Sequence, residues 1–207
     1  KTWLDVFILI PLIITGLHLL ITEKKFLLYF TSLSILFIQN YYFGYMTALF
    51  LFFWYLCQIS WNFKTRRLSF LDFVVTSFLA GLTSSIMTLP TLLDLRTHGE
   101  KLTAITKFKT DGSWYLDVFA KQFIGSFDTT KYGSIPMIFV GLLPFILTVL
   151  FFTLKSIQFH VKLVYGMFFT ILIASFYIEA LDLFWQGMHT PNMFLHRYAW
   201  IFSTLLI

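Results

Sequence analysis

The stretch VFILIPLIITGLHLLI, residues 6–21, has no charged side chain. It is nearly as long as the roughly 20 residues that a helix needs to cross the hydrocarbon core of a bilayer. Its apolar residues do not alternate with polar ones, so the stretch lacks the pattern of a strand in a membrane barrel. A helix is then the structure that satisfies its backbone hydrogen bonds in lipid. The stretch therefore predicts a transmembrane helix.

Segments of the same kind recur along the chain. Nearly uncharged runs occupy residues 48–61, 73–89, 135–154 and 163–178. The shorter run at residues 26–39 must also cross if the loops are to alternate between two sides, and a last helix opens at Arg197 and is cut off at Ile207. The predicted fold class is all-α, a polytopic transmembrane helix bundle of about seven helices with the last one truncated.

The composition supports the same class. Hydrophobic residues make up 58% of the chain and charged residues 12%, whereas about a quarter of an ordinary soluble domain is charged. We therefore expect a multi-pass protein of the cell membrane with the lipid bilayer as its partner. The net charge of +5 comes mainly from short loops, so it is not evidence for binding nucleic acid. The single cysteine, Cys57, can form no disulfide within the chain.

Basic residues in the short loops predict the orientation. The loops at residues 22–25, 64–67 and 155–162 fall on one side when the chain is threaded back and forth, and they carry seven of the 15 Lys and Arg residues. Short cytoplasmic loops are enriched in Lys and Arg. This side is therefore predicted to be cytoplasmic.

The opposite, outer side receives a long loop of about residues 91–134 and the stretch 182–196. Within the long loop, Ser113 is a plausible helix N-cap, apolar residues follow at helical spacing, and Gly125 is a stop signal. This pattern predicts a short helix at the outer membrane surface, although a connector that packs against the bundle fits it equally well. All of residues 1–207 then form a single transmembrane domain.

Sequence motifs for metal or phosphate chemistry are absent. There is no glycine-rich phosphate loop, CxxC pair or HExxH sequence. His189 and His196 come nearest to a metal pair, but Pro191 separates them, and no cysteine or carboxylate stands at ligand spacing. We therefore predict neither a metal nor a cofactor.

Polar residues concentrate at the predicted outer ends of the helices. Burying such a residue in lipid costs about 2–3 kcal/mol, so their positions are informative. Carboxylates and a cation beside tryptophans suit a ligand that combines a phosphate, sugar hydroxyls and a lipid tail. Ordinary interfacial anchoring and helix capping would give the same concentration. The residues of this outer rim are Asp5, His98, Glu100, Glu179, Asp182, His189, Asn192 and Arg197, and Trp185 lies near the same boundary.

Several blocks of the chain resemble, in order, the YfhO family of bacterial membrane proteins. They are TWLDVFILIPLIITGLHLLI (residues 2–21), SILFIQNYYFGYMTALF (34–50), TLLDL (91–95), the block at residues 123–152 and WQGMHTPNMFLHRYAW (185–200). The family comprises large multi-pass proteins related to the GT-C glycosyltransferases. The resemblance covers nearly the whole chain.

This resemblance implies an enzyme that takes a sugar from a polyprenyl-phosphate carrier. It would transfer the sugar, on the extracytoplasmic face, to a cell-envelope acceptor such as a teichoic acid or another glycopolymer, or to a glycolipid. Related GT-C enzymes carry their catalytic carboxylate in the first outer loop, which is expected upstream of Lys1. The catalytic residue is therefore unknown, and the chain is interpreted as an internal fragment.

The resemblance also implies a substrate-binding corner on the outer face, with Pro191 breaking one helix and Arg197 opening the next. There we expect Arg197 to contact the carrier phosphate as a planar, always charged donor. His189 and Asn192 would donate hydrogen bonds to the phosphate or the sugar. Trp185 is assigned to the same site, and Asp5 and Asp182 would hold the cavity by accepting hydrogen bonds.

Two features leave alternatives open at this corner. The family often has a proline and an aromatic residue before the arginine, whereas this chain has Leu195 and His196. Arg197 could also extend to lipid headgroups or pair with Asp182. For the whole protein, the alternatives are a transporter or flippase of a lipid-linked glycan and a structural scaffold in the cell envelope. A transporter would place polar residues along the full depth of the bundle, whereas here they gather at the outer rim.

Overall fold

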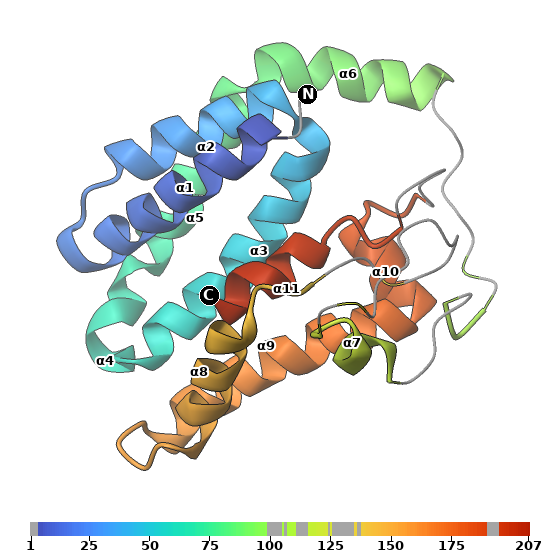
Figure 1. The fold of residues 1–207 in the computed structure, drawn as a ribbon. Coiled ribbons are helices and arrows are strands. Elements are labelled where there is room, and N and C mark those ends of the chain that lie inside the picture. Colours follow the sequence, from blue (N-terminus) through green and yellow to red (C-terminus); the bar gives the residue numbers. More distant parts are fainter. Residues whose placement is uncertain are drawn as a thin grey trace. The chain divides into compact units, whose positions relative to one another are not determined.

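The structure is a computed structural model that describes residues 4–98, 105, 107–110, 116–123, 125, 135, 138–189 and 195–207. Within these ranges every regular element is a helix, which confirms the all-α prediction. The β-structure found there is one isolated bridge between Lys109 and Ile178. The chain divides into two compact units, Lys1–Glu100 and Lys101–Ile207, and each is described by itself (Figure 1).

The helices of the two units follow the hydrophobic runs of the sequence. The first unit contains α1 (Leu4–Glu23), α2 (Leu27–Gln39), α3 (Tyr41–Ser60), α4 (Phe63–Arg66), the 3₁₀ turn η1 (Arg67–Ser69), α5 (Phe70–Thr83) and α6 (Ser85–His98). The second unit contains α7 (Asp117–Ala120), α8 (Leu142–Thr153), α9 (Phe159–Tyr177), α10 (Glu179–Trp185) and α11 (Ala199–Leu206).

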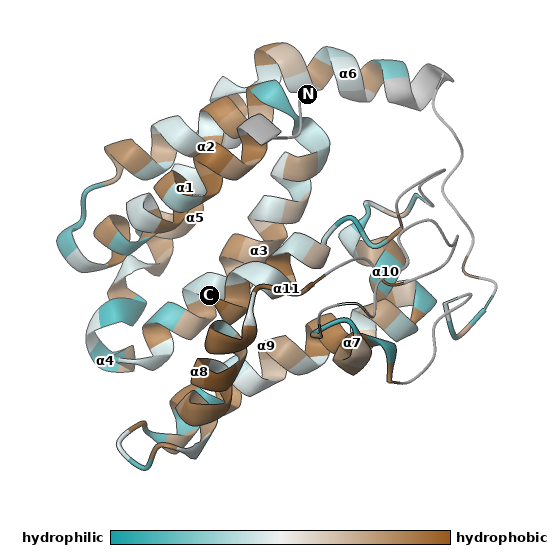
Figure 2. Ribbon diagram, viewed as in Figure 1, coloured by the Kyte–Doolittle hydropathy of each residue, from teal (hydrophilic) through white to brown (hydrophobic). Residues whose placement is uncertain are grey.

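Three of the described helices, α1, α3 and α9, are long and apolar enough to cross a membrane, and a bent pair raises the number to four. Helices α2 and α8 are apolar but shorter. Figure 2 shows apolar residues along the helices and hydrophilic residues at several of the turns between them. The chain is therefore a helical membrane protein with several candidate spans.

The predicted span at residues 73–89 is not one continuous helix. It is divided at Ser84, and the helical pair on either side is bent by 68°. Near the bend, the hydroxyl groups of Thr83 and Ser84 donate to the carbonyls of Ala80 (3.0 Å) and Gly81 (2.8 Å). Such bonds compete with the helix ladder and commonly bend helices.

The long loop also begins later than predicted. Helix α6 continues to His98, so the first residues of the predicted loop of about 91–134 are helical. Farther along, α7 confirms a helix in the loop, although it begins after Leu116 and is shorter than predicted. Gly125 has φ +86°, a conformation suited to a stop signal, whereas Ser113 lies outside the described residues. The placement of α7 at a membrane surface stays a prediction.

Helix α2 is the centre of the first unit and packs against α1, α3 and α5. Gly16 of α1 lies so close to α2 that a Cβ at this position would be 2.6 Å from the backbone nitrogen of Tyr29. On the side facing α5, the Tyr29 hydroxyl bonds the Ser77 hydroxyl at 2.8 Å, and Ser34 bonds Thr83 at 3.1 Å. Small residues and interhelical hydrogen bonds are the usual basis of helix packing in membranes.

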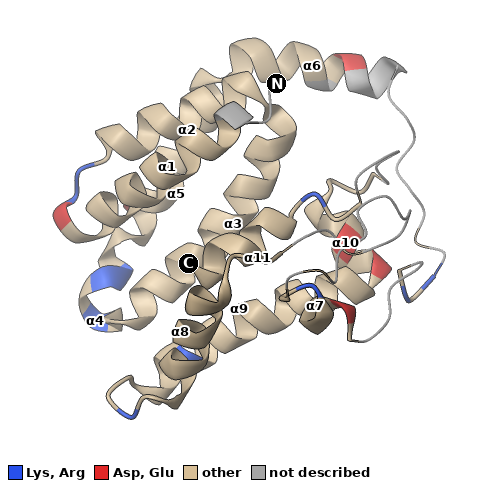
Figure 3. Cartoon of the chain, viewed as in Figure 1, with Lys and Arg blue, Asp and Glu red and all other residues tan. Residues whose placement is uncertain are grey.

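The two basic loops of the first unit lie at the same end of it. Lys24, in the turn between α1 and α2, makes an ion pair with Asp72 in the first turn of α5. Its ammonium group also donates to the carbonyl of Leu68 at 3.3 Å. Figure 3 shows the basic residues of this turn and of α4. This arrangement agrees with the grouping of residues 22–25 and 64–67 that the sequence predicted.

Replacing Gly16 by alanine should destabilise the first unit, whereas Gly81→Ala should not. The new methyl group at position 16 would meet the backbone of α2, and overpacking of this kind costs about 1–3 kcal/mol. Gly81 is also helical, but apart from its chain neighbours and the backbone of its own helix no described atom lies within 4 Å of the place that its methyl group would take. Alanine there should therefore add up to about 1 kcal/mol of helix stability. Unfolding of both variants in one detergent measures the difference. Equal stability of the two variants would contradict the close packing of α1 on α2.

Candidate functional site

The polar corner of the second unit begins at a break between α9 and α10. Ile178 at this break has an extended backbone, with φ −105° and ψ 115°. The segment 107–110 pairs with it: the Thr110 N–H donates to the carbonyl of Tyr177 at 3.0 Å, and the carboxylate of Glu179 accepts from the Lys107 N–H at 2.7 Å. Backbone groups that the break removes from the helix ladder thus find partners in the loop.

Helix α10 ends at a glycine turn and not at a proline. Gly187 and Met188 both have left-handed backbones, with φ of 69° and 63°. The Met188 N–H donates to the carbonyl of Leu183 at 2.7 Å, the long bond of a Schellman motif. The expectation that Pro191 breaks this helix was wrong, because the turn comes before it; Pro191 itself lies outside the described residues.

Helix α11 likewise begins two residues later than predicted, at Ala199. Arg197 and Tyr198 form the turn that precedes it. His196, just before that turn, has φ +56°. This backbone region is uncommon for residues other than glycine, and holding a side chain there costs about 1–3 kcal/mol.

At the centre of the corner, His196 is paired with Asp182 of α10. The distance from His196 Nδ1 to Asp182 Oδ1 is 2.6 Å, and the two side chains are 2% and 12% exposed. An ionised carboxylate only accepts hydrogen bonds, so Nδ1–H is the donor. The Tyr198 hydroxyl lies 3.4 Å from the same nitrogen. A buried carboxylate requires a hydrogen-bond donor such as His196, because an unpaired charge away from water is costly.

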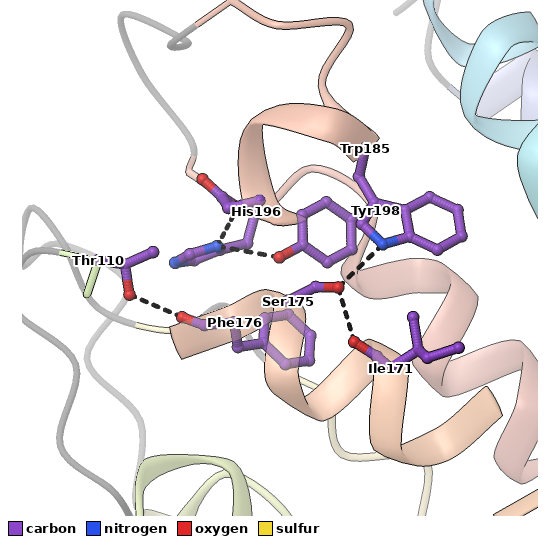
Figure 4. Close-up of polar contacts among 8 residues, drawn as sticks. Thr110, Ile171, Ser175, Phe176, Trp185, His196 and Tyr198 are labelled. Atoms are coloured by element: carbon purple, nitrogen blue, oxygen red, sulfur yellow. Dashed lines mark hydrogen bonds and ion pairs between the residues drawn. The ribbon is translucent and has the colours of Figure 1, made fainter. Parts of the chain in front are cut away.

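Aromatic rings enclose this pair. The Tyr198 ring is stacked on Phe176 at 5.4 Å and on Trp185 at 5.7 Å, and the His196 ring meets Phe176 edge-on at 5.6 Å. The Trp185 indole N–H donates to the Ser175 hydroxyl at 3.0 Å (Figure 4). Each aromatic pair contributes about 0.5–1.5 kcal/mol beyond the burial of its area. The pair thus lies in a packed box of rings.

The same burial acts on the Tyr198 phenol, which lies in the turn before α11 and outside the candidate spans. Burial raises its pKa well above the ordinary value of 10.0, and the nearby Asp182 carboxylate raises it further. The phenol therefore keeps its proton, which it can donate to the Asp182 carboxylate but not to Nδ1, because Nδ1 carries its own proton.

Two buried side chains of the corner have polar atoms that are not satisfied by the described part of the chain. These are Nε2 of His196 and both amide atoms of Gln186. Gln186 is fully buried and follows Asp182 by one helical turn. An unsatisfied buried group costs about 1–3 kcal/mol, so natural proteins contain few of them and often at functional sites.

The structure brings together part of the predicted site. Asp182 and Trp185 are buried in the corner, whereas His189 and Arg197 are half-buried beside it. Asn192 lies outside the described residues. Asp5 is in the first turn of α1, in the other compact unit, and its side chain is not described. The assignment of these six residues to substrate binding stays a prediction.

Sequence reasoning missed His196, Tyr198, Ser175 and Gln186 as members of the corner. His196 was considered as a candidate metal ligand and as a departure from the family pattern, and not as a partner of Asp182. One signal could have found it: an aspartate on an apolar helix face needs a buried partner, and His196 is a titratable residue of the next loop. Among the described residues, no group of three His, Cys, Asp or Glu side chains could hold a metal ion.

Helical spans with a polar corner at the end of a span define a polytopic membrane protein. The model of the family described as bacterial membrane protein YfhO matches residues 1–207. The chain therefore belongs to the YfhO family. No curated protein and no solved structure was found to match it.

Trp185→Ala should destabilise the protein far more than Phe184→Ala. Trp185 is 1% exposed and loses both its stacking on Tyr198 and its bond to Ser175, so we expect a cost of about 3–5 kcal/mol. Phe184 is the adjacent residue but is 42% exposed, and its truncation should cost about 1 kcal/mol or less. Denaturant unfolding of both variants in the same detergent measures the difference. Similar unfolding midpoints would show that the aromatic box does not stabilise the protein.

Proposed function

We propose that this YfhO family member is a membrane glycosyltransferase. It moves a sugar from a polyprenyl-phosphate carrier to a cell-envelope acceptor, such as a teichoic acid or a glycolipid, on the extracytoplasmic face. The family membership and the resemblance of the family to GT-C enzymes support the reaction class. The observation that carries the assignment of a site is the half-buried Arg197, which directly follows the buried pair of Asp182 and His196.

Arg197 would stabilise the leaving group of this reaction. When the acceptor hydroxyl attacks the anomeric carbon, the bond to the carrier phosphate breaks and negative charge grows on the phosphate oxygens. A guanidinium matches two of these oxygens at once and keeps its charge at any physiological pH. A preorganised cation placed where charge develops is a large contribution to catalysis.

The remaining predicted residues take supporting roles in this proposal. His189 and Asn192 donate hydrogen bonds to the phosphate or the sugar. Trp185 completes the wall of the corner. Asp182 holds the corner by accepting the hydrogen bond from His196, and Asp5 is assigned a similar role in α1. We assign no catalytic residue within this chain.

A lipid-linked glycan transporter is the second candidate, and one observation favours it. Transporter helices are often broken where they bind substrate, and the described helices are divided at Ser84 and Ile178. However, the candidate spans α1, α3 and α9 carry charged residues only in their end turns: Asp5, Glu23 and Lys162. A polar path through the bundle would require such groups at mid-depth. The enzyme is therefore the better-supported proposal.

The proposed orientation can be tested by cysteine labelling. In a Cys57→Ala background, a cysteine at position 66 should react with an impermeant maleimide only after the cells are opened. A cysteine at position 189 should react in intact cells. The reason is that short basic loops stay in the cytoplasm. Labelling of position 66 in intact cells would reverse the orientation and remove the active site from the outer face.

The role of Arg197 can be tested by comparing Arg197→Lys with Arg197→Gln in the intact protein. With a polyprenyl-phosphate sugar as donor, glutamine should lower kcat/KM by about 10- to 100-fold, as expected for the loss of a charged hydrogen bond. Lysine should restore part of the activity, because it keeps the charge but loses the second donor.

Arg67→Gln is the matched control, since Arg67 is an exposed arginine in the basic loop of the other unit. It should leave donor kinetics unchanged. Wild-type donor kinetics in folded, inserted Arg197→Gln would eliminate the phosphate contact. Movement of the intact donor across proteoliposomes without sugar transfer would favour the transporter instead.

A further inference from the structure

The residue directly before Arg197 has an unusual backbone. His196 lies in the left-handed region, with φ +56°, where a β-carbon crowds the following carbonyl. A non-glycine residue remains in this region only where its surroundings hold it. The direction of the chain at Arg197 therefore depends on what holds His196.

His196 is held on two sides. Its Nδ1 bonds the Asp182 carboxylate at 2.6 Å, and its ring packs edge-on against Phe176. Its backbone carbonyl accepts the N–H of Ala199 at 2.9 Å, the first residue of α11. The side chain is thus tied to α10 and the backbone to α11. Arg197 lies between these two attachments.

The two nitrogen atoms of the His196 ring differ in this arrangement. Nδ1 makes the bond to Asp182, whereas Nε2 is buried and has no partner in the described part of the chain. The hydrogen bond that ties the ring to α10 therefore uses Nδ1 alone. A side chain that places an amide nitrogen at the position of Nδ1 or of Nε2 replaces only one of these two atoms. Such substitutions can show whether His196 positions the turn or transfers a proton.

We propose that Asp182 and His196 are a positioning pair that fixes the direction of Arg197 toward the carrier phosphate. Neither residue touches the substrate. The identity of the ligand rests on the proposed function, but the placement of Arg197 does not. A displacement of about 1 Å at a substrate-binding group can lower the rate on the order of 100-fold. The gain from a fixed Arg197 would therefore offset the strain in the backbone of His196.

The test compares His196→Asn with His196→Gln. The amide nitrogen of asparagine takes the place of Nδ1, and asparagine tolerates left-handed backbone better than most residues. The amide nitrogen of glutamine takes the place of Nε2 and leaves Asp182 without its donor. Asparagine should therefore preserve the corner, whereas glutamine should release it.

The first measurement does not depend on activity. A cysteine at position 197, in the Cys57→Ala background, reports its surroundings through its rate of reaction with a maleimide. With asparagine at position 196 the rate should match that with histidine. With glutamine it should change by on the order of tenfold, because a released turn exposes the position differently.

The second measurement is donor turnover by the intact protein with Arg197 in place. Here His196→Gln should lower kcat/KM by on the order of 100-fold. His196→Asn should stay within about threefold of wild type, since it keeps the bond to Asp182. If His196→Gln does not fold, His196→Gly replaces it, because glycine adopts the left-handed backbone without strain but has no ring to attach.

Unchanged labelling with glutamine or glycine at position 196 would overturn the proposal. Loss of turnover in His196→Asn with unchanged labelling would also overturn it, because the essential atom would then be Nε2. The phosphate contact fails separately: it is refuted by wild-type donor kinetics in Arg197→Gln, whatever the labelling shows.

Discussion

The absence of water in the hydrocarbon core is the constraint on which this structure depends. Backbone N–H and C=O groups must find partners within the protein, so the chain forms helices wherever it is apolar. Each departure from a helix then needs its own donors. At Ser84 these are the hydroxyls of the chain itself, and at Ile178 they are the N–H groups and the threonine of the segment 107–110. The breaks occur where such partners exist.

This constraint also explains how much of the fold could be predicted. Length and apolar composition are sufficient to find α1, α3 and α9, because a continuous helix needs nothing beyond itself. The bend at Ser84 could not be found in the same way. Ser32 and Ser34 donate to carbonyls of their own helix in the same manner, and α2 remains unbroken. Hydroxyls of this kind therefore permit a bend but do not by themselves produce one.

The candidate site shows a similar division. Asp182 and Arg197 could be predicted, since charged residues in an apolar chain are costly and so mark a site. Their arrangement could not be predicted, because it depends on backbone angles that cannot be inferred from the residue types. A left-handed glycine such as Gly187 is readable from a sequence, whereas left-handed Met188 and His196 are not. At His196 the contacts of the side chain with Asp182 and Phe176 hold this backbone, and at Met188 the hydrogen bond of its N–H to Leu183 at the helix end does so.

The hydrogen-bond partner of Asp182 bears on whether Arg197 can bind an anionic ligand. The sequence left open a pair between Asp182 and Arg197, but in the described part of the chain the carboxylate is bonded to His196 and lies beside the Tyr198 phenol. A buried carboxylate that already has its donors gains little from a further cation, because desolvating that cation would cost as much as the attraction returns. Arg197 directly follows this pair in the chain and is half-buried, so it stands at the boundary of the corner. A cation at such a boundary can bind an anion that approaches from outside the box, which a cation enclosed within it could not do.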